Sequence, residues 1–184
     1  MLNLKKIFIP LLAIIFTINT VYAITAYRFD SLRDEINSMD SRTADAKDID
    51  RKLTCLARNI YFESASEPIE GKIAVAQVVM NRTQDPDFPA DVCEVVYQKN
   101  KVVEKTVCQF SWYCTKPSEL KIKSVEKYEE SMEAAKKVML EGFRLPTLKT
   151  ALYYHADYIK PHWDKKFVVQ IGHHRFFSKE KKNG

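Results

Sequence analysis

Two glutamates four residues apart are the first candidates for chemistry in this sequence. Glu63 follows apolar and aromatic residues in the stretch NIYFESASEP, and Glu67 comes directly before its proline. A carboxyl group among apolar side chains keeps its proton to a higher pH, because burial disfavours the charged form. A general acid of that kind can protonate the leaving oxygen when a glycosidic bond breaks. The pattern therefore offers Glu63 as a candidate acid, with a salt-bridged surface glutamate as the alternative.

The local pattern gives the two glutamates different positions. Apolar residues recur at helical spacing over residues 51–64, which predicts an amphipathic helix with Glu63 near its C-terminal end. The helix dipole favours cations at that end, so helix stability does not explain Glu63. Pro68 suits the first turn of a second helix, predicted over residues 68–82. Glu67 then lies beside a helix N-terminus, where an acid is stabilised, and we expect a supporting role for it before a chemical one.

The elements around these glutamates are predicted to be mainly helical. A turn-rich loop at residues 85–90 precedes a short helix at 92–97, and an amphipathic helix covers 124–141. Residues 100–114 stay open between strand and loop, because valines alternate there with charged residues. The last forty residues, rich in aromatic and β-branched types, predict two strands around a loop. The fold class is therefore α+β, mainly helical with a small β element near the C-terminus.

The N-terminal residues 1–23 have the features of a secretory signal: two lysines, an apolar stretch and the small-residue exit VYA. Their apolar run is also about as long as the ~20 residues that span a bilayer, so an uncleaved anchor is the alternative. Residues 24–50 are polar and predict a tether, followed by a catalytic domain over 51–184. We expect export in either case, to the periplasm or to the inner membrane with the domain facing the periplasm.

The overall composition fits one globular domain. The chain has 184 residues, of which 46% are hydrophobic and 29% charged. Its net charge of +5 is spread among acidic residues, which argues against a nucleic-acid partner and would suit an anionic cell envelope. Neither a Gly-rich phosphate loop nor a nucleophile elbow occurs in the sequence.

The four cysteines favour disulfides. Cys55, Cys93, Cys108 and Cys114 are even in number in a chain predicted to be exported, and three pairings are possible. The closest two lie six residues apart, which differs from common zinc knuckles. We expect two structural disulfides, with a cysteine nucleophile as a weaker alternative.

The histidines raise the question of a metal. His155, His162, His173 and His174 could supply zinc ligands, but they lack the H-E-x-x-H spacing of a helical site. Adjacent His173 and His174 would also point to opposite faces of a strand. We therefore expect neither a metal nor another cofactor, and keep a catalytic zinc as an alternative.

Five ordered blocks of the sequence resemble the SleB-like (spore-cortex-lytic type) cell wall hydrolases. The blocks are CLARNIYFESASEP, GKIAVAQVVMNR, FPADVCEVVYQ, CQFSWYC and, at the end, YYHADYIKPHW with IGHHRFF. They cover about residues 53–177. The resemblance implies a fold related to lysozyme and the lytic transglycosylases, acting on the bond between N-acetylmuramic acid and N-acetylglucosamine in peptidoglycan. The cysteines match a branch from Gram-negative bacteria and their phages, so wall remodelling and phage lysis are both open.

The resemblance places the family's catalytic glutamate on Glu63 and its second acid on Glu67. Ser64 and Ser66 depart from the usual alanine and glycine of the family motif, but all of these are small. A lytic transglycosylase needs one acid, whereas a two-carboxylate hydrolase needs a second at about 5 to 9.5 Å. We expect a transglycosylase before a hydrolase, with a zinc amidase or a non-catalytic wall-binding module as further alternatives.

The remaining blocks are expected to line the sugar groove of a monomeric enzyme. Gln109, Ser111 and Tyr154 are predicted to hydrogen-bond hydroxyl and N-acetyl groups, and Trp112 to stack on a sugar.

For the other aromatic residues of these blocks we expect interior positions. Core packing is predicted for Phe110, Trp163 and Phe176. His155 and His174 either orient groups near the cleft or are interior imidazoles.

Overall fold

The computed structural model describes residues 4–102, 105–116 and 120–179, with side chains from residue 16 onward except at 102 and 105. The chain divides into two compact units, Met1–Asp48 and Ile49–Gly184.

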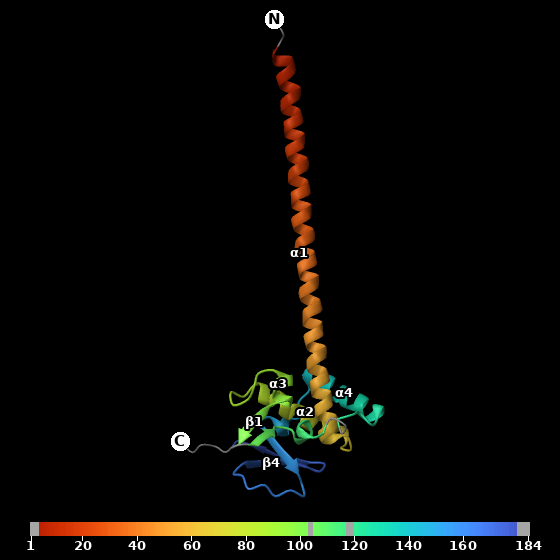
Figure 1. The fold of residues 1–184 in the computed structure, drawn as a ribbon, viewed down its shortest axis with the longest axis vertical. Coiled ribbons are helices and arrows are strands. Elements are labelled where there is room, and N and C mark those ends of the chain that lie inside the picture. Colours follow the sequence, from red (N-terminus) through yellow and green to blue (C-terminus); the bar gives the residue numbers. More distant parts are fainter. Residues whose placement is uncertain (1–3, 103–104, 117–119, 180–184) are drawn as a thin grey trace. The chain divides into compact units, whose positions relative to one another are not determined.

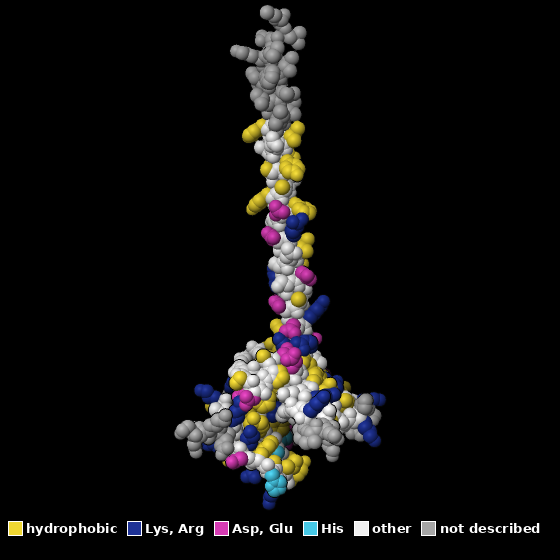
Figure 2. Space-filling view, turned by 60° about the vertical axis from the view of Figure 1, so that its left-hand side comes forward, with side chains coloured by type: hydrophobic (Ala, Val, Ile, Leu, Met, Phe, Trp, Pro, Cys, Tyr) yellow, Lys and Arg dark blue, Asp and Glu magenta, His cyan; other side chains and the backbone are white. Residues whose placement is uncertain are grey.

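Helix α1 (Leu4–Ser64) makes up the first unit and continues into the second (Figure 1). The prediction that this helix begins at Arg51 is therefore wrong, and the absence of glycine and proline from residues 24–50 explains why the polar segment can stay helical. Between Phe16 and Ile49 its large apolar side chains are exposed, among them Tyr22, and Figure 2 shows such side chains along the helix.

The predicted signal or anchor, residues 1–23, lies for the most part outside the described side chains. Within the described part of the chain, no helix combines the length and apolar character needed to cross a membrane.

The second unit is built around α2 (Ile69–Thr83), which is buried along most of its length. On one side it packs with the end of α1, with α3 (Val92–Val96) and with α4 (Val125–Met139) in the larger hydrophobic core (Figure 1). A second core joins Ala74 and Val78 of α2 to the C-terminal sheet. All residues from Ile73 to Val79 are buried, as expected for a helix at such a central position.

The C-terminal sheet has three antiparallel strands in the order β3-β5-β4: β3 (Tyr153–Ala156), β4 (Lys166–Ile171) and β5 (His174–Ser178). The α+β prediction is confirmed, but the number of strands was wrong. What the sequence suggested as one long second strand turns back at Gly172, whose φ of +56° permits a tight hairpin that other residues adopt with strain.

Residues 100–114, for which the sequence did not decide between strand and loop, include a second pair of antiparallel strands. Strand β1 (Lys99–Val102) pairs with β2 (Lys105–Cys108), and the 3-10 helix η1 (Ser111–Cys114) follows. Another 3-10 turn, η3 (Pro146–Leu148), precedes the C-terminal sheet.

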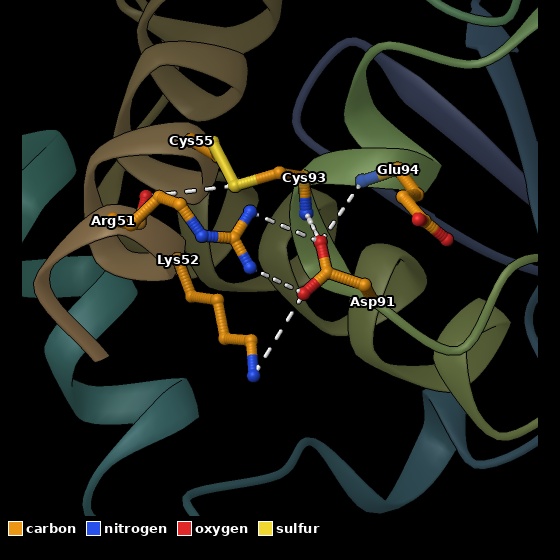
Figure 3. Close-up of a disulfide and its surroundings, with 6 residues drawn as sticks. All are labelled: Arg51, Lys52, Cys55, Asp91, Cys93 and Glu94. Atoms are coloured by element: carbon orange, nitrogen blue, oxygen red, sulfur yellow. Dashed lines mark hydrogen bonds and ion pairs between the residues drawn. A yellow bond between two sulfur atoms is a disulfide. The ribbon is translucent and has the colours of Figure 1, made fainter. Parts of the chain in front are cut away.

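The two predicted disulfides are confirmed, and the structure selects their pairing. Cys55–Cys93 ties α1 to α3 (Figure 3), and Cys108–Cys114 closes the loop between β2 and η1. Such cross-links stabilise mainly by restricting the unfolded chain.

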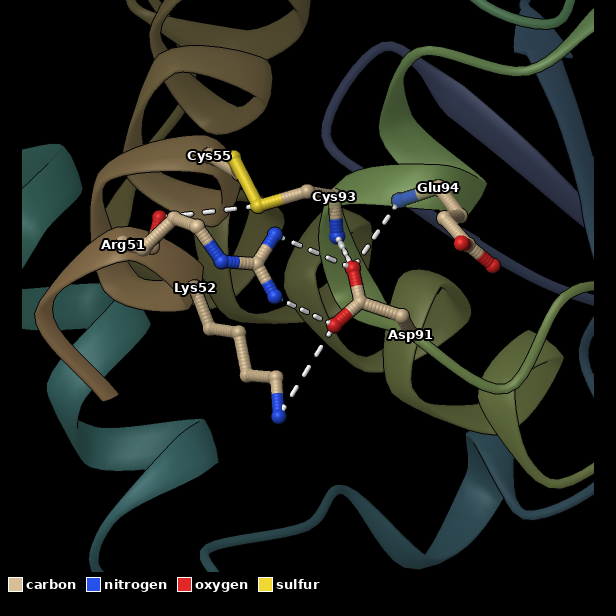
Figure 4. A network of polar contacts seen from close by, with 6 residues as sticks. All are labelled: Arg51, Lys52, Cys55, Asp91, Cys93 and Glu94. Atoms are coloured by element: carbon tan, nitrogen blue, oxygen red, sulfur yellow. Dashed lines mark hydrogen bonds and ion pairs between the residues drawn. A yellow bond between two sulfur atoms is a disulfide. The ribbon is translucent and has the colours of Figure 1, made fainter. Parts of the chain in front are cut away.

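Polar contacts surround the first disulfide. Asp91 caps α3 by accepting hydrogen bonds from the backbone N–H groups of Cys93 and Glu94, at 2.8 and 3.1 Å (Figure 4). Arg51 of α1 donates to the same carboxylate at 2.7 Å, and the ammonium of Lys52 lies 3.7 Å from it. Burial alone would raise the pKa of Asp91, but the hydrogen bonds from Arg51 and the backbone lower it overall.

Candidate active site

Glu63, at the C-terminal end of α1, opens into a cavity of about 230 Å³. Segments far apart in the sequence meet there: α1, α2, the loop closed by Cys108–Cys114, β3 and the connection before β4. The lining residues are Glu63, Arg82, Cys108, Gln109, Phe110, Ser111, Tyr153, Tyr154 and Trp163.

The Glu63 carboxyl has the surroundings of a general acid. Burial raises its pKa, while a hydrogen bond from Tyr154 and the charge of Arg82 act in the opposite direction without cancelling that effect. The Tyr154 hydroxyl donates to Glu63 Oε2 at 3.0 Å. The side chain is only half-buried, so it still reaches the cavity. Glu63 therefore combines a raised pKa with access to a ligand.

Arg82 is a buried cation in the wall of this cavity, only 3% exposed. Its Nε donates to the Leu152 carbonyl at 2.8 Å, and its guanidinium lies 5.1 Å from the ring centroids of both Phe88 and Phe110. The Gln109 amide is assigned in the orientation that points its oxygen at Arg82, because the opposite orientation would place its NH₂ group against the Arg82 donors. In this orientation the amide oxygen accepts hydrogen bonds from both Arg82 Nη atoms at 3.1 Å. Arg82 thus fixes the cavity wall and places a positive charge near Glu63.

Sequence reasoning treated Arg82 only as the end of a helix. Its position could have indicated more, because it lies at the end of a predicted buried stripe. A positively charged residue that is buried there requires a polar or charged partner.

The two tryptophans exchange the roles that the sequence suggested. Trp112 is not a sugar platform, because its ring is only 7% exposed and stacks on Phe62 with centroids 4.7 Å apart. Its Nε1 donates to Asn59 Oδ1 at 3.0 Å. Trp163, expected in the core, is 39% exposed and lines the cavity. Its indole is therefore the one available for stacking there.

The other predicted groove residues divide in a similar way. Gln109, Ser111 and Tyr154 line the cavity, although their contacts with sugars remain predictions. Phe110 and Phe176 are buried in the two cores, as expected. Phe110 also forms part of the cavity wall.

Glu67 is held away from this cavity. Its Oε2 accepts a hydrogen bond from the backbone N–H of His173 at 3.1 Å, in the β4–β5 turn. Gly172 packs so closely on the carboxylate that a Cβ there would overlap Oε2. The ammonium of Lys72 donates to the Glu67 carbonyl at 2.8 Å. The carboxylate therefore anchors a hairpin turn, which agrees with a supporting role.

The two candidate histidines lie behind the cavity wall. His174 is buried edge-on to Tyr154, with ring centroids 5.2 Å apart, and its Nδ1 lies 4.0 Å from Glu67 Oε1. Burial lowers the pKa of His174, which favours the neutral ring. His155 packs against Phe177 and its Nδ1 lies 2.8 Å from the Ala156 carbonyl oxygen. Neither imidazole lines the cavity.

The metal alternative depends on clusters of ligand side chains. Among the residues that the structure describes, no three His, Cys, Asp or Glu side chains lie close enough together to hold an ion.

Comparison with known families identifies the domain. Residues 66–177 match the sequence profile of the Cell Wall Hydrolase family. The chain belongs to this family. The matched segment begins three residues after Glu63 and includes Glu67, the cavity loop and the C-terminal sheet.

Curated relatives carry the name spore cortex-lytic enzyme. The one from Halalkalibacterium halodurans is 33% identical over 69 residues, which are 38% of this chain and 21% of the relative. The one from Bacillus cereus is 27% identical over 128 residues, which are 67% of this chain and 43% of the relative. The chain thus spans less than half the length of these relatives.

Solved structures share the fold. The catalytic domain of the germination-specific lytic transglycosylase SleB from Bacillus anthracis superimposes with a TM-score of 0.51 and 25% identity, over 69% of this chain and 93% of that domain. The SleB catalytic domain of Bacillus cereus gives a TM-score of 0.50 and 25% identity, over 69% and 89%. The resemblance drawn from the five sequence blocks is therefore confirmed.

Proposed function

We propose that this cell wall hydrolase domain cleaves the bond between N-acetylmuramic acid and N-acetylglucosamine in peptidoglycan as a lytic transglycosylase. The observation that carries the proposal is the Glu63 carboxyl, which has a raised pKa, faces the cavity and accepts a hydrogen bond from Tyr154. Family membership and the SleB-like fold support the substrate class.

In the proposed mechanism Glu63 acts first as acid and then as base. Tyr154 holds Oε2, so Oε1 is the oxygen available to carry the proton. That proton passes to the glycosidic oxygen as the bond to C1 of the muramic acid breaks. Tyr154 and the positive charge of Arg82 then stabilise the Glu63 carboxylate. The carboxylate takes the proton of the muramic acid 6-hydroxyl, whose oxygen closes on C1 to a 1,6-anhydro ring, and no water is consumed.

The distribution of carboxylates supports a single-acid mechanism. Of the described residues that line the cavity, Glu63 alone carries a carboxylate. The Glu67 carboxylate is instead bonded to the hairpin turn. A hydrolase with two carboxylates at the cleavage site remains the second candidate function, and would require a carboxylate beyond those in this cavity wall.

The sugar-binding part of the proposal uses the exposed polar and aromatic groups of the cavity. Ser111 and the Gln109 amide, which already accepts from Arg82, are placed to meet sugar hydroxyl or N-acetyl groups. Trp163 offers its ring face for stacking. All of these come from one chain, so we propose that the enzyme acts as a monomer.

The remaining proposals concern location. We propose that residues 1–23 direct export or anchor the chain, that 24–50 form a tether and that 51–184 act on the wall from the periplasmic side. The two disulfides support an oxidising location. A periplasmic reporter fused after Asp50 would be inactive if export did not occur.

The experiment compares the purified full chain with the variant Glu63→Gln on Gram-negative sacculi, with released muropeptides identified by mass spectrometry. Wild type is expected to release anhydromuropeptides, and the variant, which has lost its titratable proton, is not. Equal release by both proteins would contradict the role of Glu63, and release by neither would contradict the proposed function.

A further inference from the structure

A second hollow, of about 460 Å³, lies beside the catalytic cavity and is rich in lysine. Lys149, Lys166 and Lys179 line it, together with the single carboxylate Asp85. We name it the lysine groove after these three lysines. Most of its lining residues are polar or charged, its volume suits part of a chain-like ligand, and no step of the proposed mechanism uses it.

Neighbouring residues connect the groove to the cavity. In α2, Asn81 lines the groove and Arg82 lines the cavity; before and in β3, Leu152 lines the groove and Tyr153 the cavity. Consecutive Cα atoms are about 3.8 Å apart. At both places neighbouring residues line the two hollows, so their side chains form opposite sides of a shared wall.

A third connection comes from the beginning of β4. Lys166 lines the groove, and the ammonium of the preceding residue, Lys165, lies 4.2 Å from the centroid of the Tyr153 ring in the cavity wall. Positive charge thus extends from the edge of the cavity into the groove.

The charges within the groove favour an anion. Lys179 is already paired, with its Nζ 2.5 Å from Asp85 Oδ1 and 2.6 Å from Asp87 Oδ2. Lys149 and Lys166 are exposed and have no ion-pair partner within the part of the chain that the structure describes. Two ammonium groups are therefore available to a ligand, while the one carboxylate in the lining is neutralised by Lys179.

We propose that the lysine groove binds carboxylates of the peptide stem carried by N-acetylmuramic acid. This inference rests on the proposed function, which places that sugar in the adjacent cavity. The stem is attached to the sugar through its lactyl group and bears free carboxylates along its length. Four extended residues span roughly 13 Å, and we expect such a stem to cross the rim of the shared wall from the cavity into the groove. Lys149 and Lys166 are then specificity residues that contact the stem.

The test uses the full chain with the double substitution Lys149→Gln and Lys166→Gln, and two substrates. One is intact sacculi; the other is glycan strands from which an amidase has removed the stems. Loss of two exposed ion pairs should lower kcat/KM on intact sacculi about fivefold, through KM. Activity on the stripped strands should stay within about twofold of wild type.

A matched control removes the same charge elsewhere. The double variant Lys101→Gln and Lys121→Gln changes exposed lysines on β1 and in the segment before α4, outside both hollows. It should stay within about twofold of wild type on both substrates. An equal loss in this control would overturn the proposal in favour of general attraction to an anionic wall.

Other outcomes also decide. A groove variant that loses activity equally on both substrates would mean that the groove binds glycan, and one that loses none would mean that it binds neither; each overturns the proposal. If wild type released nothing from either substrate, the proposed function would fail. The groove is then judged by titration with a free stem tetrapeptide, for which the variant should bind about fivefold more weakly than wild type and the control should not.

Discussion

The surroundings of Glu63 and those of Glu67 differ sharply, although the two residues are of one type and lie four positions apart. Glu63 faces an open cavity and is bonded by one tyrosine hydroxyl, so its proton can be exchanged with a ligand. Glu67 is mostly buried under a hairpin turn, where its carboxylate accepts from the backbone N–H of His173 and Gly172 packs closely on it. The difference suits the proposed roles: a carboxylate that faces an open cavity can serve as an acid, whereas a buried carboxylate with fixed donors supports the scaffold.

The comparison can be broken most directly at Glu63. Replacing it by Gln removes the proton that the mechanism transfers, and we expect activity on sacculi to fall about 10²- to 10⁴-fold with little change in thermal stability. Steady-state release of muropeptides and a melting curve measure the two properties. Retention of a tenth or more of wild-type activity would show that another group is the acid.

The next largest effect is expected for stability at Glu67. Glu67→Ala leaves the partly buried N–H of His173 without its acceptor and should lower the free energy of unfolding by about 1–2 kcal/mol. Glu67→Gln keeps an acceptor oxygen and should lose less, with near-normal activity per folded molecule. Denaturant unfolding of both variants is the measurement. A Glu67→Gln protein that is stable but inactive would make Glu67 a second catalytic carboxylate.

Tyr154→Phe sharpens the comparison, because it removes only the hydroxyl that donates a hydrogen bond to Glu63. The hydroxyl lowers the pKa of Glu63 by stabilising its carboxylate, so its removal should raise that pKa further. Glu63 must be protonated to act as acid, and the alkaline limb of the kcat/KM profile should therefore move to higher pH. We also expect the maximal rate to fall roughly tenfold, because the carboxylate formed in the reaction loses a hydrogen bond. An unchanged limb would contradict the contact.

Asp91 is a carboxylate outside the candidate site that caps α3 and pairs with Arg51, so we expect it to affect stability and not catalysis. Asp91→Ala removes the α3 cap and the Arg51 contact, and should lower stability by about 1 kcal/mol without changing kcat. Because folding lowers the pKa of Asp91, its contribution is present above the usual value of 3.8 and is lost as pH falls below it. The difference in free energy of unfolding between wild type and variant should therefore be largest at neutral pH and shrink at acidic pH, and a constant difference would contradict this assignment.

Much of the helical framework was predictable, because the sequence pattern is local there. Periodicity located α2 and α4, the even cysteine number predicted two disulfides, and the aromatic setting of Glu63 pointed to an acid. The helix start was missed because polar residues can stay helical without an apolar face.

The parts that sequence reasoning missed depend on long-range packing. Trp112 and Trp163 both occur in aromatic stretches, and only the fold decides which ring faces the cavity. The two glutamates differ in their hydrogen-bond partners, which are distant in sequence. Tyr154 lies 91 positions after Glu63, and His173 lies 106 positions after Glu67. No local pattern in the stretch around Glu63 could reveal those contacts.

The most direct test of the central claim is the chemical form of the muramic acid end that the purified full chain releases from sacculi in water enriched in ¹⁸O. If Glu63 acts alone as acid and then base, the products are 1,6-anhydromuropeptides that contain no ¹⁸O at the new end. A reducing end that carries ¹⁸O would show that water attacked C1, and would contradict the single-acid account.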